Sequence, residues 1–349
     1  ILKCTLEYPQ KLAGQTRPLP EFILHNEDFM EAFYKANPGA VGKGKATKKQ
    51  KGTLFMDAKS ADAPEADLAW HVRAWGHWVL DRARRELASY YPTYADFEPI
   101  KKDHIAYERQ PMRLVPLNED GTADIDSLNA EFTEEYLADK RNPRWVAKPT
   151  VAYLWARTVT CKNCRATVPL LKTRWLCKKA NKRVLLTMEP SADGTGVVFG
   201  VDANVPSKGG NAAQKREHDK RLAGGTMSRA GVQCPCCNAI STMQDIRLEG
   251  KAGRLSSVMT AVVVDGPDGK EYRPPTEHEL AVATPGEERV QAAFKDVPFG
   301  VPEEPTPAGG GSGAGRAFSV QGYGLMKWRD LFTPRQLTAL GIFVGATRA

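Results

Sequence analysis

The sequence predicts an α+β protein in which a β-rich middle region is flanked by N-terminal and C-terminal helices. Apolar residues recur at helical spacing before residue 90, and a helix-start signal stands near residue 333. Between residue 161 and about residue 275, short apolar runs alternate with turn signals such as "ADGTG" and "DGPDGK", which is typical of strands. We therefore divide the chain into residues 1–150, 151–280, 281–322 and 323–349.

The N-terminal region, residues 1–150, is expected to be mainly helical. Its clearest helix runs from about Pro64 to Tyr90, because proline suits a first helical turn. The polar stretch 124–140 is expected to form another helix. The apolar residues that recur at three-to-four spacing in the long helix, and so are expected to face the core, are Leu68, Val72, Trp75, Val79 and Leu87.

The same region contains a Lys-rich segment, "GKGKATKKQKG", at residues 42–52. It has no apolar periodicity, so a flexible loop is expected. The loop is either a solvated surface segment or an arm that contacts phosphate. On the second interpretation, Lys43, Lys48 and Lys49 are candidate nucleic-acid-binding residues.

Residues 151–280 form the predicted β-rich region, and a linker and a helix follow it. The stretch "FGVPEEPTPAGGGSGAGRAF" is rich in Pro and Gly and lacks the features of a phosphate-binding loop. Residues 281–322 are therefore expected to be a linker. In residues 323–349, the sequence Thr333, Pro334 and Gln336 resembles a capping box with proline at the first helical position, which predicts a C-terminal helix.

Charge and composition narrow the class of function. The 349 residues carry a net charge of +8, which favours a polyanionic partner. The sequence contains neither a signal peptide nor an apolar run of the roughly 18 residues that a membrane span requires, so we expect a cytoplasmic protein without membrane contact. No paired carboxylates, Ser-His-Asp set or Cys-His set stands out, so the sequence identifies no catalytic residue.

Seven cysteines are present, and five of them lie in "CKNC" at 161–164 and "CPCC" at 234–237. Each cluster supplies a Cys-x-x-Cys pair, Cys161 with Cys164 and Cys234 with Cys237. Two such pairs give four thiolates for a tetrahedral Zn²⁺ ion, and four cysteines with no open position predict a structural site. The chain would then contain an expanded zinc ribbon, with strands filling the long interval between the pairs.

Other interpretations of the cysteines remain open at this stage. A redox-active Cys-x-x-Cys would need a βαβ setting, which the sequence lacks, and disulfides would be unusual in the cytoplasm. Only the two-residue spacing favours Cys237 over Cys236 as a ligand. Cys177, in "RWLCKK", is a possible substitute ligand.

Basic residues concentrate around the two cysteine pairs and could contact a phosphate backbone. The candidates for nucleic-acid binding in this region are Arg174, Lys178, Lys179, Lys182, Arg183, Arg229, Arg247 and Arg254.

Five stretches in this order carry a resemblance to a known family: "PTVAYLWARTVTCKNC", "VPLLKTRWLCKKANKR", "GTMSRAGVQCPCC", "EGKAGR" and "WRDLFTPRQLTAL". The chain resembles the zinc-ribbon-containing, adenine-specific DNA methylases, which are often associated with defence against phage. The resemblance runs from about Ala69 to the C-terminus and touches "LKCTLEYPQKLAG" near the start. It implies S-adenosylmethionine-dependent methyl transfer to adenine in duplex DNA, on a Rossmann-like domain that contains an inserted zinc ribbon.

The two motifs that such chemistry needs are missing from this chain. There is no Gly-rich cofactor loop, and "RPPTEHE" at 273–279 lacks both the Asp or Asn and the aromatic residue of an Asp/Asn-Pro-Pro-Tyr motif. In the family these motifs lie outside the segments matched here. The chain is therefore expected to be the zinc-ribbon and DNA-recognition or scaffolding portion of such a methyltransferase, inactive alone, with catalytic segments or subunits as partners.

A second hypothesis retains the zinc ribbon but assigns the chain no DNA-binding role of its own. The chain would then be a structural protein-interaction module, for example a docking surface for other defence-system proteins. It would bind duplex DNA weakly and with little dependence on salt.

Overall fold

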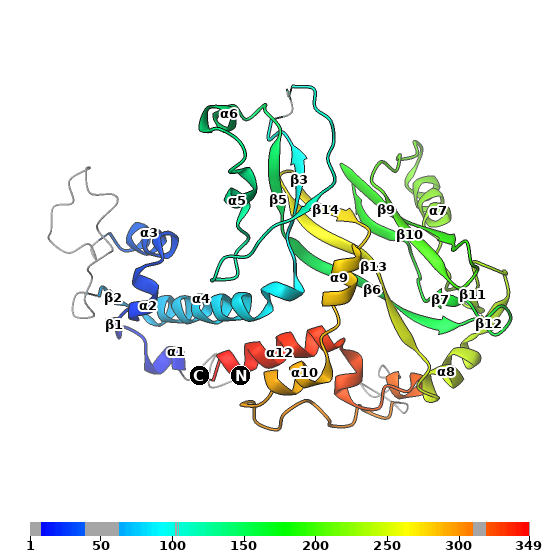
Figure 1. Cartoon of the computed structure of the whole chain (residues 1–349). Helices are drawn as coiled ribbons and strands as arrows, with labels where there is room; N and C mark the ends of the chain where they lie inside the picture. Colours follow the sequence, from blue (N-terminus) through cyan, green and yellow to red (C-terminus); the bar gives the residue numbers. More distant parts are fainter. Residues whose placement is uncertain (1–7, 39–62, 102, 104, 310–318, 349) are drawn as a thin grey trace. The chain divides into compact units, whose positions relative to one another are not determined.

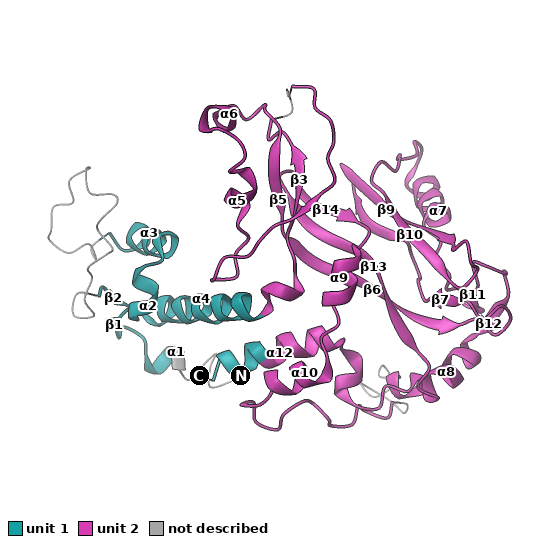
Figure 2. Ribbon diagram, viewed as in Figure 1, with its two compact units in different colours: residues 1–86, 342–349 teal, residues 87–341 magenta. Residues whose placement is uncertain are grey.

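The computed structural model describes residues 8–38, 63–101, 103, 105–309 and 319–348. The chain divides into two compact units, residues 1–86 with 342–349 and residues 87–341 (Figure 1; Figure 2). Helices and strands are both abundant, as expected for the α+β class. Over the described residues, every helix is too short or too polar to cross a membrane.

The first unit is built around the long helix α4 (Leu68–Leu87). Its core contains Phe29, Phe33 and Trp70, whose rings meet edge to face. The other elements of this unit are α1 (Tyr8–Lys11), β1 (Arg17–Pro18), α2 (Glu21–Leu24), α3 (Glu27–Ala36) and β2 (Glu65–Ala66).

The buried side of α4 differs from the side that the sequence predicted. Trp70, Ala74 and Leu87 are buried, whereas Val72 and Trp75 are 63% and 49% exposed. The phenylalanines of α3 select the side that carries Trp70, because they offer it a matching aromatic surface. The predicted core stripe is therefore corrected: part of it is an exposed apolar surface.

Over the residues that the structure describes, the second unit contains four sheets. Their strand orders are β4-β3-β5, β14-β13-β6-β7, β10-β9-β8 and β11-β12, and every pairing is antiparallel. The strands are β3 (Tyr94–Glu98), β4 (Arg113–Leu114), β5 (Arg144–Lys148), β6 (Thr150–Thr160), β7 (Thr167–Pro169), β8 (Trp175–Lys179), β9 (Lys182–Pro190), β10 (Val197–Asp202), β11 (Gly231–Gln233), β12 (Ile240–Thr242), β13 (Ser256–Gly266) and β14 (Gly269–Arg273).

Helices lie between these strands and after them (Figure 1). The most basic is α7, which follows β10, and α8 follows directly from β12. The helices are α5 (Ile125–Asn129), α6 (Glu134–Ala138), α7 (Ala212–Leu222), α8 (Met243–Lys251), α9 (Glu277–Val282), α10 (Glu287–Ala293) and α12 (Pro334–Ala346), with short 3-10 turns η4 (Ala88–Tyr90), η5 (Val320–Tyr323) and η6 (Trp328–Leu331).

Residues before 150 are less helical than the sequence suggested. They supply the whole β4-β3-β5 sheet, in which β3 pairs with β5 from Tyr94 to Glu98. The stretch 124–140 is two short helices instead of one. Asp124 and Thr133 each cap a helix start, since their side chains accept from the backbone N–H groups of Ser127 and Tyr136. The first helix ends at Asn129, and the cap at Thr133 starts the second.

The expected linker over 281–322 also needs correction. Residues 287–293 form α10, and Val290, Phe294 and Val301 pack with Leu337 of α12 in one apolar cluster. These apolar residues anchor the segment in a small core, although its high Pro and Gly content is typical of a linker. Helix α12 begins at the expected residue, where Thr333 and Gln336 exchange hydrogen bonds as a capping box.

A buried lysine connects two of the sheets. Lys148 is at the end of β5. Its Nζ atom lies 2.8–2.9 Å from a carboxylate oxygen of each of three acids: Asp96 and Glu98 on β3, and Glu271 on β14. Although burial lowers the pKa of Lys148, hydrogen bonds with the carboxylates raise it above its ordinary value. The lysine therefore stays charged and holds three acids together.

Replacing this lysine should weaken the second unit. We expect Lys148→Met to lower the free energy of unfolding by about 2 kcal/mol, because three neighbouring carboxylates lose their shared cation while remaining partly hydrated. Urea unfolding of the variant beside Lys270→Met, an exposed lysine on β14, provides the comparison. Equal stability of the two variants would show that the ion pairs of Lys148 contribute nothing to the free energy of unfolding.

Candidate metal centre

The first cysteine pair forms the turn that joins β6 to β7. The backbone N–H of Cys161 donates to the carbonyl of Ala166 at 2.8 Å, and the N–H of Arg165 donates back to the carbonyl of Cys161 at 3.0 Å. Arg165 has φ of 67°, so the chain reverses in the left-handed region directly after Cys164. The strand pair β6–β7 holds the two ends of this turn in register.

The second pair repeats the same local geometry between β11 and β12. The N–H of Cys234 donates to Ala239 at 2.9 Å, and the N–H of Asn238 donates to Cys234 at 2.9 Å. Asn238 has φ of 61° and occupies the place that Arg165 has in the first turn. Cys164 directly precedes Arg165, and Cys237 directly precedes Asn238. Cys237 therefore has the same place in the second turn as Cys164 has in the first, and we assign the second ligand position to it.

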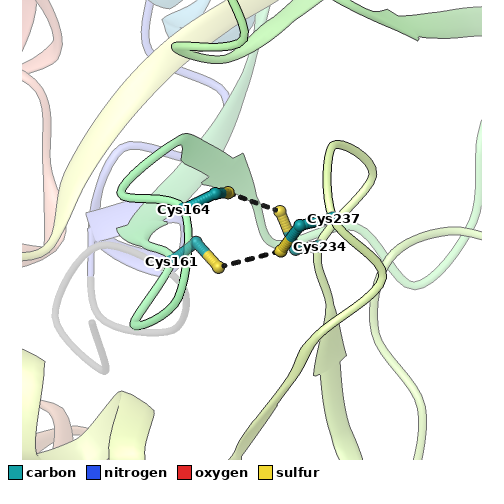
Figure 3. A group of neighbouring side chains, drawn as sticks. All are labelled: Cys161, Cys164, Cys234 and Cys237. Atoms are coloured by element: carbon teal, nitrogen blue, oxygen red, sulfur yellow. Dashed lines mark hydrogen bonds between the residues drawn. The ribbon is translucent and has the colours of Figure 1, made fainter.

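The two turns bring four sulfurs together (Figure 3). The Sγ atoms of Cys161 and Cys237 are 3.7 Å apart, and those of Cys164 and Cys234 are 3.6 Å apart. All four Sγ atoms lie within 4.8 Å of one another. A tetrahedral zinc ion with bonds of about 2.3 Å would separate its sulfurs by about 3.8 Å, so the spacing fits such an ion.

The two other candidate cysteines lie outside this group. The thiol of Cys236 donates to the carbonyl of Gly196 at 3.2 Å, in the turn between β9 and β10. Cys177 is on β8, beside Tyr272 of β14, where it helps to raise the pKa of that tyrosine after the larger effect of burial. The geometry thus favours Cys237 over both alternatives.

The site is supported by an apolar cluster. Cys161 and Cys234 are only 1% and 2% exposed and pack with Val159, Val232 and Ile246. Ile246 lies on α8, which follows directly from β12. Lys162 in the first turn also pairs with Asp245 on α8 at 2.9 Å. The turns are therefore held by hydrophobic packing and by an ion pair, in addition to any metal.

Neighbouring groups shift the pKa values of Cys164 and Cys237 in opposite directions. Hydrogen bonds from the Asn163 side chain and the Ala239 backbone lower the pKa of the Cys237 thiol to about 6. Although the Ala166 backbone lowers the pKa of Cys164, burial and the neighbouring thiols raise it to about 12. Metal binding would deprotonate all four, because the thiolate is the ligand.

Zinc, if bound here, would connect the β6–β7 turn with the β11–β12 turn. Four thiolates fill a tetrahedral shell, so the ion would have no position for water or substrate. The arrangement fits a structural metal, which stabilises the fold and performs no chemistry.

The basic candidates are in several different environments. Arg174 is committed to the fold, since its guanidinium donates to the carbonyls of Leu222 and Gly224 at the end of α7 and to Leu186. Arg183 lies over the Trp175 ring at 4.7 Å. Both side chains therefore serve mainly to attach α7 to the β8–β9 hairpin.

An acid that sequence reasoning did not single out organises this region. Asp219 of α7 is 7% exposed and accepts from Arg183 at 2.5 Å and from Lys178 at 2.9 Å. Hydrogen bonds from Arg183 and then Lys178 lower its pKa to about 2. The sequence signal was weak, because Asp219 is one of two acids, with Glu217, in a helix that also carries four Lys or Arg.

Low pH should remove the stabilisation that the ion pairs of Asp219 provide. Because the pKa of Asp219 is lower in the folded chain than in the unfolded one, its ion pairs stabilise the fold above about pH 4 and lose this effect as the pH falls towards 2. We expect Asp219→Asn to melt at a lower temperature than the wild type at pH 7, with the difference shrinking below pH 4. Melting curves of both proteins between pH 2.5 and about pH 7 test this; a constant difference would contradict it.

The remaining candidates are on exposed surface. Arg254 pairs with Glu249 at 2.8 Å, and Arg247 lies over the Tyr323 ring at 5.7 Å. Arg229 and Lys179 are exposed, and Lys182 is partly exposed. Lys43, Lys48 and Lys49 lie outside the described residues.

Comparison with known proteins adds no further constraint. No protein-family model, curated protein or solved structure matches this chain. The fold and the site thus define a class in general terms: a mixed helix and strand protein with a four-cysteine candidate metal centre.

Proposed function

We propose that this chain is the zinc-ribbon and DNA-recognition or scaffolding portion of an S-adenosylmethionine-dependent, adenine-specific DNA methyltransferase, of the kind associated with phage defence or restriction-modification. The observation that carries the proposal is the group of Cys161, Cys164, Cys234 and Cys237, with sulfur spacing suited to zinc. The ordered sequence resemblance supplies the link to adenine methylation.

In this proposal the chain binds and positions DNA and performs no chemistry. The methyl donor and the flipped adenine would bind to other segments or subunits, because the motifs for both are missing here. The zinc ion would fix the two turns, and the basic surface beside them would hold duplex DNA. The excess of Lys and Arg supports this role through counterion release from phosphates.

The test is duplex DNA binding by the zinc-loaded chain across a salt series. We expect the logarithm of the binding constant to fall steeply with the logarithm of salt, by roughly 0.9 for each phosphate contact. Absence of binding at low salt would overturn the DNA-recognition role.

A protein-interaction module is the second candidate function, and one observation favours it. Val72, Trp75 and Leu80 of α4 are 63%, 49% and 54% exposed, so this helix leaves three large apolar side chains uncovered, and exposed apolar surface is typical of protein-interaction sites. In that case duplex binding would be weak and nearly independent of salt.

A further inference from the structure

Helix α4 leaves one of its sides apolar and exposed. The residues on this side follow one another at spacings of three or four, and they are Ala69, Val72, Gly76 and Leu80. All four are exposed to solvent. The aromatic core of the first unit instead packs around Trp70, which points to another side of the helix. The exposed side of α4 is therefore a surface on which another apolar element could pack.

Two hollows lie along this side of the helix and meet at Trp75. The first has a volume of about 480 Å³ and is lined by α4 and by residues 12–17. The second has a volume of about 400 Å³ and is lined by α4 and by the end of α12. All of these lining residues belong to the first unit (Figure 2). We call the two hollows together the α4 groove. From Leu68 to Leu80 the helix rises about 18 Å, so the groove is long enough for about three turns of a second helix.

Gly76 lies in the middle of the α4 groove. A Cβ atom placed on this glycine would have no heavy atom of the described residues within 4 Å, so packing within the chain does not require a glycine there. Glycine inside a helix is destabilising relative to alanine. Its missing side chain does, however, allow another backbone to approach closely. The glycine thus favours a groove that receives a second chain.

The edges of the α4 groove are positively charged. Arg17 and His71 line one edge, where the His71 ring nitrogen Nε2 lies 3.1 Å from the Arg17 carbonyl oxygen. Arg73 lies at the other edge, one helical turn before Gly76. Over the described residues, neither arginine has an acid within ion-pairing distance, and no acid lines the groove. The carboxylate of Asp67 instead caps α4, because it accepts from a backbone N–H in the first turn.

These features favour one kind of occupant over two others. A second copy of this chain would bring two positively charged edges together, which is unfavourable. A membrane-bound helix inserts a protruding apolar side into the lipid, whereas the apolar residues of α4 line hollows on either side of Trp75. An amphipathic helix with acidic residues at its edges matches both the shape and the charge of the groove.

We propose that the α4 groove binds an amphipathic helix of a partner protein. The apolar side chains of that helix enter the two hollows, and its Asp or Glu residues pair with Arg17 and Arg73. The two backbones approach most closely at Gly76. This inference does not depend on the proposed DNA role, because the groove lies in the first unit and the cysteine centre in the second.

The test uses labelled peptides and the full zinc-loaded chain. The probe is a fluorescein-labelled peptide of about 14 residues, or about four turns, with Leu along one side of the helix and Glu at both edges. A second peptide carries Lys in place of every Glu, and a third has the composition of the first with its Leu positions scrambled. Fluorescence anisotropy measures binding of each peptide. Co-sedimentation with vesicles of phosphatidylcholine and phosphatidylglycerol tests the membrane alternative.

Two double variants remove equal apolar surface. The groove variant is Val72→Gln with Leu80→Gln. The control is Val198→Gln with Leu248→Gln in the second unit, where the two side chains are 60% and 54% exposed and so resemble Val72 and Leu80 in type and exposure. Both variants should melt close to the wild type, because all four side chains are exposed.

We expect the groove variant to bind the Glu peptide at least about tenfold more weakly than the wild type, and the control to stay within about twofold. Arg17→Glu with Arg73→Glu should reverse the preference from the Glu peptide to the Lys peptide. Gly76→Ala should melt at a higher temperature and yet bind the Glu peptide more weakly, because its methyl group occupies the space of the second backbone.

Several results would overturn the inference. These are no binding of the Glu peptide by the wild type, equal binding of the Glu, Lys and scrambled peptides, equal weakening by the groove and control variants, and binding of vesicles without binding of the peptide. Unchanged peptide binding by Gly76→Ala would overturn the close backbone contact. Duplex DNA binding by the groove variant should equal that of the wild type, so failure of this inference leaves the proposed function standing.

Discussion

Cys234→Ser is expected to release zinc and to unfold the region around the two cysteine turns. Serine has nearly the same shape as cysteine, so little packing is lost, but a neutral hydroxyl is a poor zinc ligand. Structural zinc contributes about 10–16 kcal/mol of binding free energy, so one ligand in four accounts for roughly 3 kcal/mol, or a hundredfold in affinity. In competition with a chelator, the purified variant should bind zinc about a hundredfold more weakly than the wild type, and it should melt at a lower temperature.

Cys236→Ser provides the matched control, because it changes the same residue type two positions away. Its thiol donates to Gly196 and lies outside the sulfur group. We expect this variant to keep one zinc per chain and to melt close to the wild type. Loss of zinc from Cys236→Ser, together with its retention in Cys234→Ser, would reverse the ligand assignment.

Glu279→Ala is expected to be the most destabilising change outside the metal centre. Glu279 is 0% exposed, and both of its oxygens accept from Arg273, at 2.7 and 2.8 Å. The same carboxylate accepts from the N–H of Thr276, closing the capping box that starts α9. Its removal leaves a largely buried arginine without a counter-charge, which costs about 3–5 kcal/mol.

The control for this prediction lies on the same turn of α9. Glu277 is exposed and is also an acid near the helix N-terminus. We expect Glu277→Ala to change the free energy of unfolding by less than about 0.5 kcal/mol. Denaturant unfolding of the two variants measures the difference directly. Similar stabilities would show that the Arg273–Glu279 pair is energetically neutral.

Local features of the fold and the site could be predicted from the sequence. A Cys-x-x-Cys pair forms its ligand geometry within a few residues, so the spacing alone was enough to identify candidate thiols. The cap at Thr333 is equally local, since it depends on residues three positions apart. The short apolar runs after residue 161 also became strands, because period and turn residues act over short distances.

Features that depend on distant partners could not be predicted. The pairing of Asp219 with Arg183 joins residues 36 positions apart, and that of Lys148 with Glu271 joins residues 123 positions apart. The periodicity of α4 identified a helix but not its buried side, which α3 selects through Phe29 and Phe33. The preference for Cys237 over Cys236 also became clear only when Asn238 proved to occupy the same backbone position as Arg165.

The most direct test of the central claim, a four-thiolate zinc site, is to count zinc and map the protected cysteines in the full chain. Native mass spectrometry gives the zinc content, and alkylation before and after chelation shows which of the seven thiols the metal protects. We predict one zinc per chain and protection of Cys161, Cys164, Cys234 and Cys237 that chelation removes. A chain without zinc, or a protected set that includes Cys236 or Cys177 in place of one of the four, would contradict the account.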